Sequence, residues 1–111
     1  MMKKKLIFFD LDDTLLRRDK SVSENTIKVL KRLQEDGHKI IIATARNKFS
    51  TMPLVDKLMP DYAIINAGGY IINQERVVIR NLLIDKELSC KLINELKEKV
   101  ETISIQCDDV L

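Results

Sequence analysis

The sequence predicts a protein of the α/β class, with a three-layer arrangement around a parallel sheet. Two short apolar runs, 6–9 and 39–43, lack the polar alternation of half-exposed strands, and a helical pattern lies between them. Each run is followed directly by a polar residue. Ligands of such sheets gather at the carboxyl ends of the strands, so the same pattern predicts a functional site at that edge.

The first forty residues read as strand, helix, strand. Residues 6–9 form an unbroken apolar run, which predicts a strand buried on both faces. Ser21 and Glu24 offer a capping box for the helix that follows, and Gly37 offers its end. The apolar positions of this helix are Ile27, Leu30 and Leu33. Residues 39–43 then predict a central parallel strand, which completes a βαβ unit.

The later elements are predicted from spacing and from turn residues. Apolar residues three apart between 49 and 58 predict a helix that Pro53 either starts or kinks. Residues 62–66 read as a third strand, and the apolar runs 70–72 and 76–79 read as a hairpin. Asp85 caps a helix that carries Leu88, Leu92, Leu96 and Val100, and an alternating strand begins at Ile103. The change of pattern predicts two parts, 1–69 and 70–111.

Composition narrows the class of protein. The chain of 111 residues is 45% hydrophobic, enough to bury the core of one small domain. Its net charge of +2 comes from interspersed charges, which argues against a nucleic-acid-binding surface. No apolar run is long enough for a signal peptide or a membrane span, and Cys90 and Cys107 lack metal-ligand spacing. We therefore expect a cytoplasmic protein, with both cysteines buried as packing residues.

The residues with a chemical signature are Asp10 and Asp12. They follow the first predicted strand, and in extended backbone two residues apart they project to the same side. One carboxylate of such a pair can attack phosphorus, while the other gives a proton to the leaving oxygen and later takes one from water. Two anions facing a phosphate need a cation between them, and hard oxygen ligands favour Mg²⁺. Thr44, after the second strand, has a hydroxyl and an N–H to offer to phosphoryl oxygens.

These motifs resemble the haloacid dehalogenase superfamily of hydrolases. The segment from Phe8 to Leu16 is similar to its first motif, a hydrophobic strand followed by DxDx[TV], and 40–46 is similar to its second. The sequence TAR at 44–46 and the segment 66–72 resemble the Cof-type subfamily (subclass IIB) in particular. The resemblance implies an incomplete Rossmann-like core at 1–69 and, at 70–111, the beginning of an inserted α/β cap domain.

The resemblance also implies roles for single residues. Asp10 becomes the nucleophile and a Mg²⁺ ligand, and Asp12 becomes the general acid/base and a ligand through its backbone carbonyl. Phosphate or substrate binding falls to Thr44, Ala45, Arg46 and Asn66. The residues alone leave Arg46 open between a site contact and a surface ion pair. Asp13 and Ala45 stand where the family commonly has glycine.

Two later motifs of the family, a lysine and an acidic pair, are not matched by any segment of this sequence. Asp108 and Asp109 are weak candidates for the acidic pair and fit better as cap residues. The leading hypothesis is a Mg²⁺-dependent phosphatase of small phosphorylated metabolites that works through an aspartyl phosphate. The alternative is a truncated relative that at most binds Mg²⁺ or phosphate. A receiver domain is disfavoured because its acceptor aspartate belongs after the third strand, where Asn66 stands.

The incomplete sheet carries one further expectation. Three core strands and part of a cap leave apolar edges uncovered, so we expect the isolated chain to self-associate or to be marginally stable. We expect the partners of the protein to be its small substrates, with neither a nucleic acid nor a membrane among them.

Overall fold

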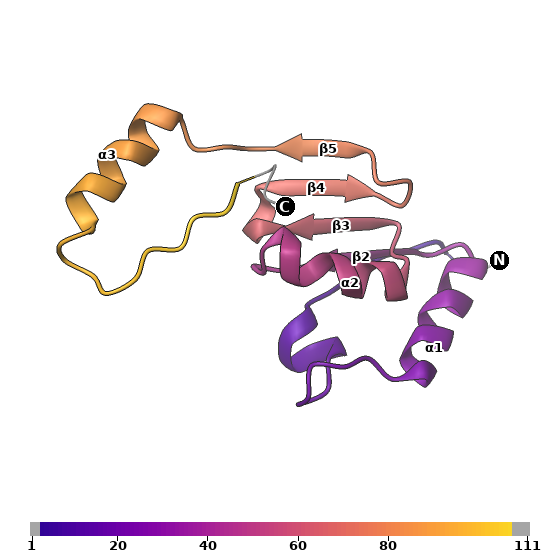
Figure 1. The fold of residues 1–111 in the computed structure, drawn as a ribbon. Helices are drawn as coiled ribbons and strands as arrows, with labels where there is room; N and C mark the ends of the chain where they lie inside the picture. The colour runs from indigo at the N-terminus through magenta and orange to yellow at the C-terminus, as the bar shows by residue number, and fades with distance from the viewer. Residues whose placement is uncertain (1–2, 108–111) are drawn as a thin grey trace. The chain divides into compact units, whose positions relative to one another are not determined.

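The computed structural model describes residues 3–107, which divide into two compact units, 3–81 and 82–107. The first unit holds one sheet of five strands in the order β1-β2-β3-β4-β5 (Figure 1). The pairs β1–β2 and β2–β3 are parallel, while β3–β4 and β4–β5 are antiparallel. This confirms the predicted α/β class, the βαβ unit and the hairpin.

The elements of the first unit follow the predicted order. The strands are β1 (Leu6–Phe9), β2 (Lys39–Ala43), β3 (Tyr62–Ile65), β4 (Tyr70–Asn73) and β5 (Val78–Asn81). The helices are α1 (Glu24–Glu35) and α2 (Lys48–Leu58), with a π-helical turn, η1 (Leu11–Leu15), and a 3₁₀ turn, η2 (Asn66–Gly68). Helix α2 runs on through Pro53, so this proline neither starts nor ends it.

Helices α1 and α2 share one face of the sheet. Leu30 of α1 and Leu58 of α2 belong to the same apolar cluster as Ile40 and Ile42 of β2. A second cluster joins Val55 of α2 to buried residues of β3 and β4, namely Ala63, Ile65, Tyr70 and Ile72. Burial of these apolar side chains supplies the main favourable term in the folding free energy of this unit, at about 25 cal/mol per Å² of apolar surface.

Strand β1 differs from its prediction, because it is not buried on both faces. Its only described neighbour is β2, so it lies at the edge of the sheet. Leu6 is 66% exposed and Phe8 is 58% exposed, whereas Ile40, Ile41 and Ile42 of β2 are all buried. An apolar run therefore identified both strands but did not distinguish the edge strand from the central one.

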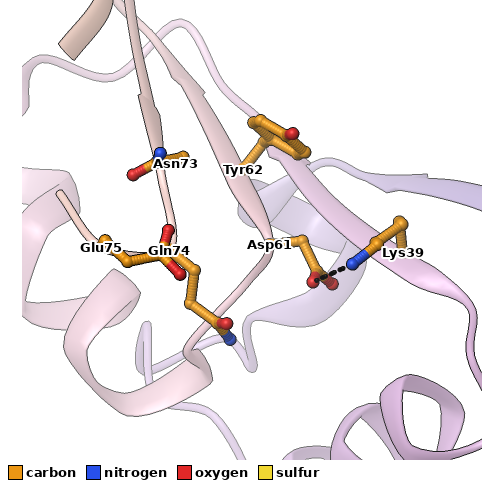
Figure 2. Close-up of a pocket in the computed structure, with 6 residues that line it drawn as sticks. All are labelled: Lys39, Asp61, Tyr62, Asn73, Gln74 and Glu75. Atoms are coloured by element: carbon orange, nitrogen blue, oxygen red, sulfur yellow. Dashed lines mark hydrogen bonds and ion pairs between the residues drawn. The ribbon is translucent and has the colours of Figure 1, made fainter. Parts of the chain in front are cut away.

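Asp61 forms hydrogen bonds that connect the amino-terminal ends of β2 and β3 to the end of α1. Its Oδ2 accepts hydrogen bonds from the Ile40 N–H at 2.8 Å and from the Gln34 side chain at 3.0 Å. Its own N–H donates to the Ile40 carbonyl at 2.8 Å, and Lys39 forms an ion pair with Oδ1 at 3.4 Å (Figure 2). This edge is opposite to the one that carries Asp10 and Thr44.

The second unit contains helix α3 (Lys86–Leu96), whose N-cap is Asp85, as predicted. The helix ends before Val100, and residues 103–107 are not in a strand, so the strand expected to begin at Ile103 is absent from the described part. Cys90 and Cys107 are exposed and free, which corrects their expected burial. Within residues 3–107, no helix combines the length and the apolar content that a membrane span needs.

The two units do not divide where the sequence suggested. The prediction placed the boundary after residue 69, but β4 and β5 continue the sheet of the first unit, and the compact units separate after Asn81. The identity of 70–111 as the beginning of a cap domain stays a prediction.

Candidate active site

The turn after β1 presents Asp10 and Asp12 to solvent. Leu11, between them, is fully buried in the apolar cluster under the sheet, whereas Asp10 is exposed and the side chain of Asp12 is 39% exposed. Asp10 and Asp12 both have extended backbone angles. The buried leucine thus anchors the turn and leaves both carboxylates on its outer side.

The shape of this turn also explains a feature of the motif. The Leu16 N–H donates to the Leu11 carbonyl at 2.9 Å, which closes a wide turn of the π type. Within it, Asp13 has a φ of 60°, in the left-handed region where glycine is favoured. Aspartate tolerates this region better than most residues, so Asp13 can occupy this position of the turn.

The carboxylate of Asp10 has one described hydrogen bond, from the Leu11 N–H to its Oδ1 at 2.8 Å. No described side chain donates to its other oxygen, and the residue is exposed. The carboxylate is therefore accessible at the carboxyl end of β1, as a nucleophile requires.

Asp12 is held by two cations. Arg46 grips it in a bidentate contact, Nε to Oδ2 at 2.9 Å and Nη2 to Oδ1 at 2.8 Å. Lys20 adds a contact from Nζ to Oδ1 at 3.0 Å. These hydrogen bonds, that of Arg46 first, hold the pKa of Asp12 well below its usual range, and the same contact raises the pKa of Arg46.

The segment after β2 is tied to the turn after β3. The Asn66 N–H donates to the Arg46 carbonyl at 2.9 Å, and the Ala67 N–H donates to the Thr44 carbonyl at 3.0 Å. Asn66, Ala67 and Gly68 have φ values of 53°, 52° and 101°, a run of left-handed residues that turns the chain sharply here. Strained backbone of this kind is common beside functional sites.

Thr44 is buried, and its hydrogen bonds limit what it can offer. Its N–H donates to the Ile64 carbonyl at 2.9 Å in the sheet, so that N–H is not available to a phosphoryl oxygen as the sequence suggested. Its Oγ1 accepts from the Arg46 N–H at 3.0 Å, which leaves the hydroxyl proton to donate. The next residue, Ala45, is exposed and has no described partner for its N–H.

The structure thus brings the predicted residues to one edge of the sheet and adds Lys20, which sequence reasoning missed. Thr44, Arg46 and Asn66 are connected by hydrogen bonds, and Arg46 reaches Asp12. Lys20 lies in a polar loop with no periodic pattern, and only its charge near an acidic motif offered a signal. The roles of these residues in chemistry stay predictions.

A shallow hollow elsewhere on the surface is separate from this edge. It has a volume of about 200 Å³ and lies by the amino-terminal ends of β2 and β3 (Figure 2). Its lining is polar and consists of Lys39, Asp61, Tyr62, Asn73, Gln74 and Glu75. None of the candidate catalytic residues lines it.

The site has the type of oxygen ligand that Mg²⁺ prefers, but its described residues supply too few of these ligands. Asp10 and the backbone carbonyl of Asp12 are hard oxygen donors of the type that Mg²⁺ prefers. Within residues 3–107, no group of three or more His, Cys, Asp or Glu side chains is placed to hold a metal ion. Water or groups outside that range, where Asp108 and Asp109 lie, would have to fill the remaining positions.

Several known phosphatases are similar to this chain over part of their length. The uracil-derivative phosphatase YwtE of Bacillus subtilis is 32% identical over 109 residues, which cover 96% of this chain and 37% of YwtE. YitU of the same organism, named a 5-amino-6-(5-phospho-D-ribitylamino)uracil phosphatase, is 38% identical over 68 residues, which cover 61% of this chain and 25% of YitU. The chain spans 25% to 42% of the length of three curated relatives from this bacterium.

Solved structures and a family model agree with these relatives. A haloacid dehalogenase-like hydrolase from Bacteroides thetaiotaomicron superposes with a TM-score of 0.77 at 29% identity, over 86% of this chain and 38% of that one. The family model described as haloacid dehalogenase-like hydrolase matches residues 7–111. Since that match takes in nearly the whole sequence, this chain belongs to the haloacid dehalogenase-like hydrolases.

Proposed function

We propose that the protein is a Mg²⁺-dependent phosphatase of small phosphorylated metabolites, to which this chain contributes the nucleophile and the general acid/base. The observation that carries the proposal is the bidentate contact of Arg46 with Asp12. It joins the ends of two parallel strands, which supports a single site made of the exposed Asp10, Asp12 and the buried Thr44. The phosphatase names of the relatives support the same reaction class.

The reaction has two displacements. An oxygen of Asp10 attacks phosphorus, and the bond from phosphorus to the substrate oxygen breaks. Asp12, which is ionised in the free protein, first takes up a proton as its contacts with Arg46 and Lys20 loosen, and then gives that proton to the leaving oxygen. Asp12 then takes a proton from water, the resulting hydroxide attacks phosphorus, and the bond to Asp10 breaks to release orthophosphate. Bound Mg²⁺ supplies positive charge that allows an anionic phosphate to approach two carboxylates.

Other groups of the chain hold the phosphoryl oxygens. The Thr44 hydroxyl has a proton to donate, and the Ala45 N–H is exposed beside it. Donors that are fixed before the substrate arrives stabilise the charge that develops in the transition state. Thr44 is fixed in this way, because its N–H, its carbonyl and its Oγ1 are all engaged by backbone groups.

The test is hydrolysis of p-nitrophenyl phosphate by the natural protein with Mg²⁺, compared with an Asp10→Asn variant. We expect Asp10→Asn to lower kcat by at least about 10³-fold, because the amide is not a nucleophile. Asp13→Asn is the matched control, since it removes a charge from the same turn and asparagine also tolerates a positive φ. An Asp10→Asn variant as active as the parent would refute the proposal.

A second candidate function applies to the stretch 1–111 in isolation. The lack of a three-donor metal cluster among its described residues favours a chain that binds phosphate or Mg²⁺ weakly without turnover. Hydrolysis by the 111-residue chain alone, abolished by Asp10→Asn, would exclude this alternative. Orthophosphate binding without hydrolysis would support it.

A further inference from the structure

The loop between η1 and α1 presents a lysine to the site. The Arg17 N–H donates to the Ser21 carbonyl at 2.8 Å, and the Lys20 N–H donates to the Arg17 carbonyl at 2.9 Å, so residues 17–21 form a closed turn. Lys20 has a φ of 66° within this turn. Its ammonium group reaches back eight residues along the chain to Asp12 Oδ1 at 3.0 Å.

The two cations on Asp12 are not equivalent. Arg46 makes two hydrogen bonds, its side chain is 21% exposed, and its backbone is fixed to Thr44 and Asn66. Lys20 makes one hydrogen bond from a side chain that is 53% exposed. Single ion pairs at the surface contribute little, whereas a bidentate arginine contact is stronger and directional. Lys20 is therefore the partner that can leave at low cost.

Both cations also use the same atom. Oδ1 of Asp12 accepts from Arg46 Nη2 and from Lys20 Nζ, while Oδ2 accepts from Arg46 alone. A lysine is a compact charge on a flexible stem, so it moves readily to a stronger anion nearby. A phosphate monoester that enters beside Asp10 and Asp12 brings up to two negative charges and several acceptor oxygens.

We propose that Lys20 is a substrate-binding residue that rests on Asp12 Oδ1 in the free protein and moves to a phosphoryl oxygen when the substrate enters. The proposal rests on the proposed phosphatase function and adds to it a residue outside the two family motifs. The transfer removes one of the two donors from Oδ1 and leaves Arg46 to orient Asp12. When the substrate enters, Lys20 therefore leaves Asp12 Oδ1 in the same step, and this oxygen becomes available to the leaving group.

The experiment compares Lys20→Met, Lys20→Arg and Arg18→Met in the natural protein with Mg²⁺. Arg18 is the control because it is exposed in the same loop, carries the same charge and has no described contact with Asp12. The readouts are equilibrium binding of inorganic orthophosphate and the separate kcat and KM values for p-nitrophenyl phosphate. Thermal melting of each variant shows that the fold is retained.

We expect Lys20→Met to weaken orthophosphate binding and to raise KM, each about tenfold, with a smaller change in kcat. Lys20→Arg should recover most of both losses, and Arg18→Met should change neither by more than about twofold. If Lys20→Met binds orthophosphate like the parent, or if Arg18→Met shows the same loss, the assignment of Lys20 is overturned.

Failure of the underlying function gives a different result. A parent protein that binds orthophosphate through Lys20 but hydrolyses nothing would overturn the phosphatase proposal and keep Lys20 as a phosphate ligand. A parent that hydrolyses the aryl phosphate with a KM indifferent to Lys20→Met would keep the phosphatase and overturn the Lys20 proposal. A parent that neither binds orthophosphate nor hydrolyses the ester would overturn both.

Discussion

At the scale of single residues, Arg46 connects three other residues of the candidate site. Its guanidinium holds Asp12, its N–H donates to Thr44 Oγ1, and its carbonyl accepts from Asn66. The sequence left Arg46 undecided between the site and a surface ion pair. The structure shows that the two alternatives coincide, because the acidic partner is itself the candidate general acid/base.

The bidentate geometry predicts that charge alone cannot replace Arg46. In Arg46→Lys the positive charge stays, but the two parallel hydrogen bonds to Asp12 are lost. We expect kcat for p-nitrophenyl phosphate to fall about tenfold to 100-fold, because a misoriented acid slows proton transfer. Full activity in Arg46→Lys would show that only the charge matters at this position.

The hydrogen bonds of Asp61 lead us to predict how the stability of the fold depends on pH. Burial opposes its ionisation, but hydrogen bonds from the Ile40 N–H and from Gln34, with the charge of Lys39, set its pKa below the usual value. The folded chain therefore holds this proton less tightly than the unfolded chain. The stabilisation is complete above the unfolded pKa, about 3.8, and is lost as the pH falls through the folded value.

Urea unfolding between about pH 6 and about pH 3 checks this dependence. We expect Asp61→Asn to cost about 1–3 kcal/mol at neutral pH, since it weakens hydrogen bonds to a partly buried acceptor. We also expect this variant to lose less stability than the parent on acidification. Glu35→Gln is the control, because Glu35 is exposed and its side chain has no described hydrogen bond. Parallel acid profiles of the parent and Asp61→Asn would contradict the assignment.

Which site residues the sequence can reveal depends on whether they follow a strand. Asp10, Asp12 and Thr44 were found because apolar runs end directly before them, and strand ends meet at one edge. Lys20 reaches Asp12 from an irregular loop through a left-handed backbone, and no periodic pattern encodes that approach. The Thr44 N–H was misjudged for a related reason, since its use depends on pairing with β3.

At the scale of elements, the structure shows which of two serines caps the amino-terminal end of helix α1. The sequence suggested a capping box that starts at Ser21, but α1 begins at Glu24, and Ser23 accepts from the Thr26 N–H at 3.1 Å. We expect Ser23→Ala to lower the free energy of unfolding by about 1 kcal/mol, as the loss of an N-cap typically does. Ser21→Ala, which removes only an exposed contact with Asp19, should cost clearly less. Equal costs in chemical denaturation would contradict the cap assignment.

The helices and strands could largely be predicted from the sequence, but which of their faces are buried could not. The β-branched runs, Gly37 with its φ of 93°, and Asp85 gave the strands, the end of α1 and the start of α3. Helix α2 was located correctly, yet Phe49 of its predicted apolar face is 57% exposed while Leu54 is buried. Spacing fixes the period of a helix, but the neighbouring elements decide which of its sides is covered.

At the scale of the whole molecule, the first unit has an open sheet edge. In the described part of the chain, β1 pairs with β2 alone, which leaves one side of its backbone without a strand partner. Leu6, Phe8 and Tyr62 also expose 66%, 58% and 40% of their surface. An exposed apolar edge strand is a template for pairing with another chain.

We therefore predict that the isolated 111-residue chain self-associates through β1. Sedimentation velocity should show concentration-dependent association at roughly micromolar to millimolar chain concentrations. Phe8→Lys should shift the chain toward monomer, because a charge on an edge strand opposes pairing between strands. Val29→Lys is the matched control, since Val29 is 50% exposed but lies on helix α1, not on a strand that could pair with another chain. A parent chain that stays monomeric with a sharp cooperative melt would refute the prediction, and an equal response to both substitutions would place the association elsewhere than β1.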